Sequence, residues 1–439
     1  MGETTGEGAL VKQARTGYVD LLRRNRDFRQ LWLGQVVSQM GDWFDTIALY
    51  TIVLNLTGSG RAVGLVLVAR FLPSVILGPA SGVIADRFSR RSIMIISDVV
   101  RAVVVLGFLL VRSADELWLV YVLTVIQLVF STFFEPARTA AIPSIVAPRD
   151  LVAANTISSA TWSTMLTLGA AVGGLITGWV GTNAAFVLDS ATYLLSAALI
   201  MTVRLPRRAP QQKKKLTIAS ALGLSQTLEG MKYVGSRPRV FAYLMVKPAW
   251  GLGGGILALL AVFGEKIFPV GRSAATGIGV LYAARGIGTA IGPFAARRFG
   301  GETRTRMQTA IGISFLIGGL FYITFGSATN FVFAVIVLAV AHTGGSVLWV
   351  FSTVLLQQSV EDNFRGRVFA AELALFTLTM AASNYLTGEL LDRYGFSPRA
   401  VTVGIGVFFL LPGVVWFITR RWWNEEKMSD TLQAAGRKS

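Results

Sequence analysis

The chain has 439 residues, of which 53% are hydrophobic and 15% are charged. Soluble domains carry about 25% charged residues, so this composition argues against an ordinary soluble enzyme. There is no cysteine and only one histidine, His342, which leaves no cysteine chemistry and little scope for a metal site. We therefore expect neither a metal nor a cofactor. The net charge of +17 raises the possibility of nucleic-acid binding, and the positions of the bases decide it.

Twelve apolar stretches of about twenty residues follow one another, each long enough to cross a hydrocarbon core of about 30 Å as a helix. Those of the first half cover residues 31–56, 62–85, 92–112, 117–137, 153–180 and 184–203. Backbone groups inside a membrane must bond within their own segment, so helices are predicted throughout. Residues 1–30 mix acids and bases without an apolar core, and we expect a cytoplasmic tail and no cleaved signal peptide.

A polar segment at 204–238 separates the two halves. Its apolar residues are spaced as in a short amphipathic helix: Leu216, Leu222, Leu224, Leu228 and Met231. Such a helix would lie on the inner membrane surface, where the basic run at 213–215 favours anionic headgroups. The alternative is a passive tether between the halves.

The second half repeats the pattern of the first. Its apolar stretches cover residues 239–263, 273–296, 307–326, 330–356, 368–391 and 398–419, and a tail follows at 420–439. The second stretch of each half carries an Arg and then Gly-Pro, in VLVARFLPSVILGP and VLYAARGIGTAIGP. We therefore predict an all-α membrane protein of twelve transmembrane helices, in two pseudo-symmetric six-helix bundles at 31–203 and 239–419.

The bases lie mostly on one side of the predicted membrane. Thirty-one of the 41 Lys and Arg fall in the two tails, the central segment and the turns on the same side, whereas six fall in the opposite turns. This bias places both termini in the cytoplasm and removes the support for nucleic-acid binding. Four bases lie within spans: Arg70, Arg101, Lys247 and Arg285.

Two motifs carry a resemblance to a known family. Residues 82–91 read GVIADRFSRR, which is similar to the loop motif G-x-x-x-D-R-x-G-R-R/K of the major facilitator superfamily, with Ser89 in place of Gly. Residues 169–174 read GAAVGG, which resembles that superfamily's antiporter motif G-P-x-x-G-G, with Ala170 in place of Pro. Other segments resemble the branch that holds the macrolide efflux proteins and the enterobactin exporter: GDW at 41–43, DVVRA at 98–102, FEPAR at 134–138, EGMKYV at 229–234 and RGRVF at 365–369.

The resemblance implies a role for each motif. In this superfamily the loop motif latches the two halves in one of the alternating states, and its residues here are Gly82, Asp86, Arg87, Arg90 and Arg91. The expected partner of Asp86 is Arg365 or Arg367, before the eleventh span. The alternative is that these bases are ordinary positive-inside charges. The antiporter-like motif contributes Gly169, Gly173 and Gly174.

Ionisable groups within spans are costly and are therefore candidates for function. Asp45, Arg70 and Asp189 each lie about fourteen residues from the cytoplasmic end of their span, or roughly 21 Å, and so on one level. We expect Asp45 to pair with Arg70, and Asp42 or Asp45 to take up a proton during transport. The alternative is a permanent ion pair that only fixes helix packing.

Asp98 and Arg101 lie three residues apart near the cytoplasmic side and can pair on one helical face. With Glu135 at a similar level they could form a cytoplasmic gate, although a structural ion-pair network is the favoured interpretation.

The remaining candidates have two readings each. Lys247 and Arg285 could meet an anionic substrate group, or Lys247 could snorkel to the membrane surface. His342 could relay protons or be a packed neutral histidine. Trp43, like Trp250 and Trp349, could form an aromatic wall for a flat substrate or belong to the core.

Together these features predict a transporter and not an enzyme. We expect a proton-coupled exporter of drugs or other amphipathic molecules in the inner membrane, monomeric and working by alternating access. An exporter of an anionic metabolite such as a siderophore, or of a lipid-like substrate, is the alternative, and a membrane scaffold or sensor without flux is another. There is no G-x-x-x-x-G-K-[ST] motif, so ATP hydrolysis is not the expected energy source.

Overall fold

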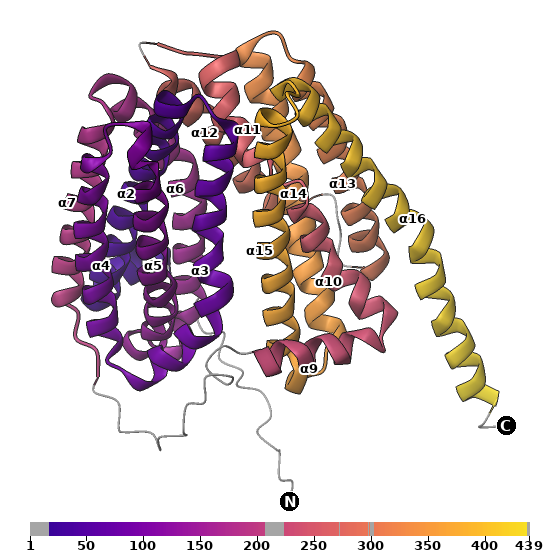
Figure 1. The fold of residues 1–439 in the computed structure, drawn as a ribbon. Helices are drawn as coiled ribbons and strands as arrows, with labels where there is room; N and C mark the ends of the chain where they lie inside the picture. The colour runs from indigo at the N-terminus through magenta and orange to yellow at the C-terminus, as the bar shows by residue number, and fades with distance from the viewer. Residues whose placement is uncertain (1–16, 207–223, 272, 297, 299–302, 437–439) are drawn as a thin grey trace, which may run out of the picture.

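A computed structural model of the chain describes residues 17–206, 224–271, 273–296, 298 and 303–436, and these residues form helices joined by short turns (Figure 1). The helices of the first half are α1 (Tyr18–Arg24), α2 (Arg26–Thr57), α3 (Gly60–Arg87), α4 (Arg90–Gly107), α5 (Leu117–Ile145), α6 (Leu151–Trp179) and α7 (Thr182–Met201). Those of the second half are α9 (Leu224–Gly235), α10 (Pro238–Gly251), α11 (Ile256–Val262), α12 (Ala274–Ala295), α13 (Arg304–Ser327), α14 (Phe331–Ser359), α15 (Asp362–Asp392) and α16 (Pro398–Gly436). The predicted all-helical architecture is therefore confirmed.

Several helices extend beyond the predicted spans. The predicted N-terminal tail contains α1 and the first turns of α2, and α16 continues to Gly436 in the predicted C-terminal tail. Of the predicted linker helix, α9 contains Leu224, Leu228 and Met231, whereas Leu216, Leu222 and the basic run at 213–215 lie outside the described residues.

In the described part of the chain, eleven segments are long and apolar enough to cross a membrane, and α2 is not among them. α2 has 32 residues, which is ample length, but it carries acids in its middle at Asp42 and Asp45. The helix that was predicted as the first span thus departs from a simple apolar span, and its acids belong to the site described below.

The predicted seventh span is not one continuous helix. α10 ends at Gly251, α11 begins at Ile256, and a π-helical turn at Phe263–Ile267 follows. The glycine run GLGGG at 251–255 explains the break, because glycine is a poor helix former. Ser383 of α15 satisfies the freed backbone: Gly255 N donates to Ser383 Oγ at 2.9 Å, and Ser383 Oγ donates to Leu252 O at 2.6 Å.

The helices pack into two groups that meet along two seams (Figure 1). In the first half α2 packs on α6 and α7, and α5 packs on α3 and α4. In the second half α14 packs on α12 and α13, α16 on α13, and α15 on α10. The two groups meet where α3 packs on α15 and where α6 packs on α12.

Glycines allow backbones to approach closely at both seams. A Cβ at Gly174 would lie 2.9 Å from Ala275 O and from the Cα of Gly279, and one at Gly64 would lie 2.6 Å from Asn384 O.

The two ends of the helical bundles are named here for use below. We call the end that holds the turns at 58–59, 180–181 and 393–397 the distal end. The proximal end is the one where α9 and the last turns of α16 lie (Figure 1).

Candidate functional site

Asp45 of α2 lies in the interior of the first helical group and is fully buried. Its Oδ2 lies 3.6 Å from Arg70 Nη1 of α3 and accepts a hydrogen bond from Gln127 Nε2 of α5 at 3.2 Å. The pairing of Asp45 with Arg70 that sequence analysis predicts is therefore present. Asp45 Oδ1 and Arg70 Nη1 have no hydrogen-bond partner among the described residues, so this pair is only partly satisfied.

Asp42 lies one turn before Asp45 and is more accessible, with 37% of its side chain exposed. Tyr193 of α7 donates its hydroxyl hydrogen to Asp42 Oδ1, and Arg101 Nη1 of α4 lies 3.7 Å from the same oxygen. Gln127 Nε2 also donates to the Tyr193 hydroxyl at 3.2 Å. Gln127 and Tyr193 thus connect the two α2 carboxylates through hydrogen bonds.

Arg101 joins Asp42 to a second carboxylate on its own helix. Its Nη2 donates to Asp98 Oδ1, as predicted from their spacing, and Ser196 Oγ donates to Asp98 Oδ2 at 2.7 Å. The guanidinium lies over the ring of Tyr193 at 4.3 Å and that of Phe134 at 4.8 Å. Arg101 thus joins Asp98 and Asp42 in an ion-pair network, the alternative to a gate that the sequence offers for this pair.

Glu135 does not belong to that cluster. It pairs with Arg138 one turn later on α5, at 2.8 Å, and nearly half of its side chain is exposed. Arg138 Nη1 in turn donates to Gln35 Oε1 at 2.8 Å. The neighbouring base on its own helix is closer to Glu135 than Arg101 is, which is why the predicted grouping fails.

Asp189 of α7 is fully buried and faces α2 at Gly41. Thr192 Oγ1 donates to its Oδ1 at 3.2 Å, and its Oδ2 has no hydrogen-bond partner among the described residues. A Cβ on Gly41 would collide with Asp189 Oδ1 and with Thr192, so the glycine before Asp42 is what lets α2 lie against α7 here.

The antiporter-like glycines position α2 and α12. A Cβ at Gly169 would lie 2.7 Å from Trp43 Cδ1, and one at Gly173 would lie 2.8 Å from Trp43 O. Trp43 is thereby held between α2 and α6, and its ring lies 5.9 Å from that of Tyr282 on α12. Trp43 is half-buried at a seam between the halves.

Arg285 is half-buried one turn after Tyr282 and makes no ion pair with a carboxylate of the described chain. It lies within electrostatic range of the hydroxyls of Tyr50, Tyr282 and Tyr322. The Tyr50 ring lies 5.8 Å from that of Tyr282. Because the Arg285 guanidinium lies among tyrosines and has no carboxylate partner in the described chain, it is available to bind a ligand.

His342 is packed and hydrogen-bonded. Its Nδ1 lies 3.1 Å from Leu338 O, which requires Nδ1 to carry the hydrogen, so Nε2 accepts from the Tyr322 hydroxyl at 3.4 Å. Tyr322 also contacts the imidazole edge-on, with 5.7 Å between ring centres. These bonds account for His342 as a neutral core histidine.

Lys247 is buried and does not snorkel to a membrane surface, so that expectation is wrong. In this structure it is paired with a carboxylate, and contact with a substrate anion stays a prediction. Its Nζ lies 2.8 Å from Glu372 Oε2 of α15, and both side chains are buried. The ammonium also lies 4.5 Å from the centre of the Trp349 ring. Glu372 lies near the start of the predicted span 368–391, but α15 begins earlier, at Asp362, and places it well inside the helix.

At the proximal end the loop-motif bases bind within the first half. Arg90 Nη1 donates to Ala140 O, and at 3.1 Å to Ser144 Oγ; Arg91 Nη2 donates to Met201 O. Arg87 is exposed, Gly82 lies within α3, and the side chain of Asp86 lies outside the described residues.

The expected partners of Asp86 are engaged in the second half. Arg365 lies 2.7 Å from Asp362 on its own helix, and Arg367 lies 3.1 Å from Glu229 of α9. On the arginine side, the predicted pairing across the halves is thus replaced by pairs within one half.

The distal end is closed by a cluster that sequence analysis missed. Asp392, the last residue of α15, accepts hydrogen bonds from Ser59 Oγ, from Gly60 N at 3.2 Å and from Arg61 N at 2.8 Å. Arg61 Nε lies 2.8 Å from Glu389 Oε1. We call these five residues the distal latch. Asp392 serves as a cap for the first turn of α3, although the two segments are more than 300 residues apart.

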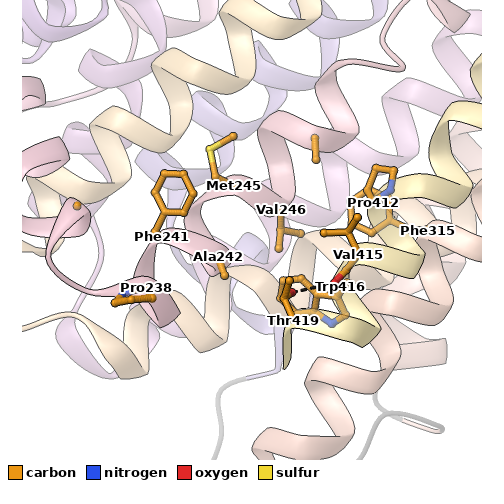
Figure 2. A pocket seen from close by; sticks show the side chains of 12 residues that line it. Pro238, Phe241, Ala242, Met245, Val246, Phe315, Pro412, Val415, Trp416 and Thr419 are labelled. Atoms are coloured by element: carbon orange, nitrogen blue, oxygen red, sulfur yellow. Dashed lines mark hydrogen bonds between the residues drawn. The ribbon is translucent and has the colours of Figure 1, made fainter. Parts of the chain in front are cut away.

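An apolar cavity of about 590 Å³ lies elsewhere, between α10, α13 and α16 (Figure 2). Phe241, Met245, Phe315, Val415 and Trp416 are among its lining residues, and no charged side chain lines it. It contains none of the predicted site residues.

The described part of the chain contains no group of three or more acidic or histidine side chains that could hold a metal ion.

The family model of the Major Facilitator Superfamily matches residues 31–371. The chain belongs to this superfamily. It is accordingly a multi-pass membrane protein and a secondary transporter, and not an enzyme.

Known relatives of this major facilitator are distant but cover most of its length. It is 26% identical over 407 residues to the uncharacterized MFS-type transporter YfiS of Bacillus subtilis, covering 90% of this chain and 91% of that one. It is 24% identical to macrolide efflux protein A of Streptococcus pyogenes, with 88% and 93% covered. The putative bacilysin exporter BacE of Bacillus subtilis is 26% identical, with 82% and 87% covered.

Solved structures agree on the fold. A bacterial homologue of the human lysosomal transporter Spinster, inward-facing and unoccupied, matches with a TM-score of 0.70 at 16% identity, covering 92% of this chain and 98% of that one. A POT family transporter in complex with 5-aminolevulinic acid matches with a TM-score of 0.72 at 12% identity, with 93% and 98% covered. The predicted all-helical major facilitator fold is confirmed.

Proposed function

We propose that this transporter is a proton-coupled exporter of amphipathic small molecules. Two six-helix bundles, at 31–203 and 239–419, would rock against each other and expose a site between them alternately to the two sides of the membrane. The small molecule and the proton would be its partners within the lipid, and it would act as a monomer.

The observation that carries this proposal is an excess of acid in the first bundle. Three buried carboxylates (Asp45, Asp98 and Asp189) and the partly exposed Asp42 share two guanidiniums (Arg70 and Arg101). Even without Asp42, the buried carboxylates outnumber the guanidiniums by one. Burying an unbalanced negative charge is costly, so at least one carboxyl is expected to bind a proton. Asp45 Oδ1 and Asp189 Oδ2, which lack hydrogen-bond partners, are the places for it.

The direction of transport rests on the relatives, two of which are named as a macrolide efflux protein and a putative bacilysin exporter. Orientation rests on the bases: thirty-one of 41 lie on the side of the tails, which would be the cytoplasm. The membrane would be the inner membrane, with the distal end facing outward and the proximal end facing the cytoplasm.

Transport by purified protein in liposomes with an imposed pH gradient tests this function. A panel of amphipathic cations, neutral compounds and anions would be followed together with a pH-sensitive dye. We expect one class to move against its gradient and protons to move the opposite way, and dissipating the pH gradient should stop both. Transport at a rate independent of the pH gradient would contradict proton coupling. If no compound is transported at all, the result would instead favour a scaffold or sensor.

A second candidate, export of an anionic compound, is favoured by Arg285 alone. A half-buried guanidinium with no carboxylate partner in the described chain is suited to a carboxylate or phosphate of a substrate. In that case Arg285→Gln should raise the KM for an anionic substrate about tenfold or more and leave transport of a neutral compound unchanged. Equal KM values in the variant and the wild type would remove this candidate.

A further inference from the structure

Lys247, Glu372 and Trp349 meet at one level of the second bundle. Counted from the proximal ends of their helices, each lies nine or ten residues in, or about 15 Å along the axis. Lys247 comes from α10, Trp349 from α14 and Glu372 from α15, and α10 packs against the other two helices.

The ammonium of Lys247 is held as a bound organic cation would be. It lies 2.8 Å from Glu372 Oε2, 4.5 Å from the centre of the Trp349 ring and 5.7 Å from that of Phe369. A carboxylate combined with aromatic faces is the arrangement that proteins use to bind ammonium groups of ligands. Phe376 contacts Trp349 edge-on at 5.1 Å and fixes its orientation.

Two components of the site are not fully used by Lys247. Glu372 Oε1 is buried and has no hydrogen-bond partner among the described residues. Trp349 is 39% exposed, whereas Lys247 and Glu372 are only 5% and 3% exposed. A ligand can therefore reach the aromatic wall first and the carboxylate behind it.

We propose that Glu372, Trp349 and Phe369 form a binding site for the cationic group of an amphipathic substrate, and that Lys247 is a tethered competitor occupying it in the empty protein. The substrate cation displaces the ammonium and takes its contacts with the carboxylate and the indole. Without a cation, Lys247 keeps the buried Glu372 neutralised, which avoids an unpaired charge in the membrane. This inference names a substrate class for the proposed exporter and so rests on that function, but the site itself requires no proton coupling.

Equilibrium binding to the full-length protein in nanodiscs tests the inference, with radiolabelled tetraphenylphosphonium as the probe. This ion carries a permanent charge, so protonation of the ligand does not enter the measurement, and all variants are compared at one pH. Triphenylphosphine oxide, neutral and of similar shape, is the matched ligand. Lys247→Met keeps the apolar stem and removes the competitor, and we expect it to tighten tetraphenylphosphonium binding about tenfold without changing binding of the neutral ligand.

The double variant Lys247→Met with Glu372→Gln distinguishes binding at this site from a general change in packing. Its affinity for tetraphenylphosphonium should return to the wild-type value, because the carboxylate that attracts the cation is gone. Trp349→Leu, which leaves the ion pair in place, should weaken tetraphenylphosphonium binding about fivefold or more and serves as the second test if Lys247→Met does not fold.

Three results would overturn the inference: unchanged tetraphenylphosphonium affinity in folded Lys247→Met, an equal gain for both ligands, or a gain that survives Glu372→Gln. None of these depends on a pH gradient. Absence of proton-driven transport with the expected binding pattern would instead count against the proposed function alone.

Discussion

Asp45→Asn is expected to reduce proton-driven transport to the background of empty liposomes. The substitution keeps the shape of the side chain but removes the negative charge 3.6 Å from Arg70 Nη1, inside the first bundle. Breaking a buried ion pair on one side leaves the other charge uncompensated, which costs about 3–5 kcal/mol. If Asp45 carries the proton, the variant also loses the group that the gradient acts on.

Comparing two transport modes distinguishes coupling from simple damage. Net efflux driven by the pH gradient should disappear in Asp45→Asn, while substrate exchange at equal pH, which needs no net proton movement, should continue. Asp115→Asn, an exposed acid before α5, is the matched control and should behave as wild type. Asp42→Asn tests the neighbouring carboxyl, and full gradient-driven activity in both Asp42→Asn and Asp45→Asn would reject a role for α2 in coupling.

Asp392→Asn is expected to shift the protein toward a state that is open at the distal end. In the closed state Asp392 accepts hydrogen bonds from Ser59 Oγ, Gly60 N and Arg61 N. Hydrogen bonds to a charged group contribute about 1.5–3 kcal/mol each, and each 1.4 kcal/mol lost changes the ratio of the two states about tenfold. The amide retains part of these bonds, so we expect a shift of at least about tenfold.

The chain lacks cysteine, so a single introduced cysteine reports the opening directly. Leu391→Cys is a suitable reporter, because Leu391 contacts Gly60 of the other bundle in the closed state. Its reaction with a membrane-impermeant maleimide should be about tenfold faster in the Asp392→Asn background. Asp362→Asn is the control, since Asp362 is on the same helix and pairs with Arg365 of its own bundle. Equal labelling rates with Asp392→Asn and Asp362→Asn would show that the latch does not hold the distal end.

The spans and two ion pairs could be predicted from the sequence because they depend on local or regular properties. Length and apolar composition fix a membrane helix, and the rise per residue puts Asp45 and Arg70 on one level, where the structure pairs them. Asp98 and Arg101 could be paired for the same reason, since i and i+3 lie on one helical face.

Contacts between distant segments could not be predicted. Glu372 binds Lys247 because α15 packs on α10, and the sequence does not state which helices are neighbours. The same holds for Asp392, whose partners are 331 to 333 positions earlier in the chain. The break after Gly251 could have been suspected from GLGGG, but its stability depends on Ser383 of another helix.

The seam between α6 and α12 has a consequence for the speed of the cycle. Gly174 meets Gly279 there, so two backbones touch without side chains between them. This contact orders few side chains when it forms, so we expect it to add little to the activation barrier of rocking. The distal latch, by contrast, exchanges charged hydrogen bonds for water whenever it opens. We therefore expect the polar latch, and not the glycine contact, to set most of the barrier between the closed and the open state.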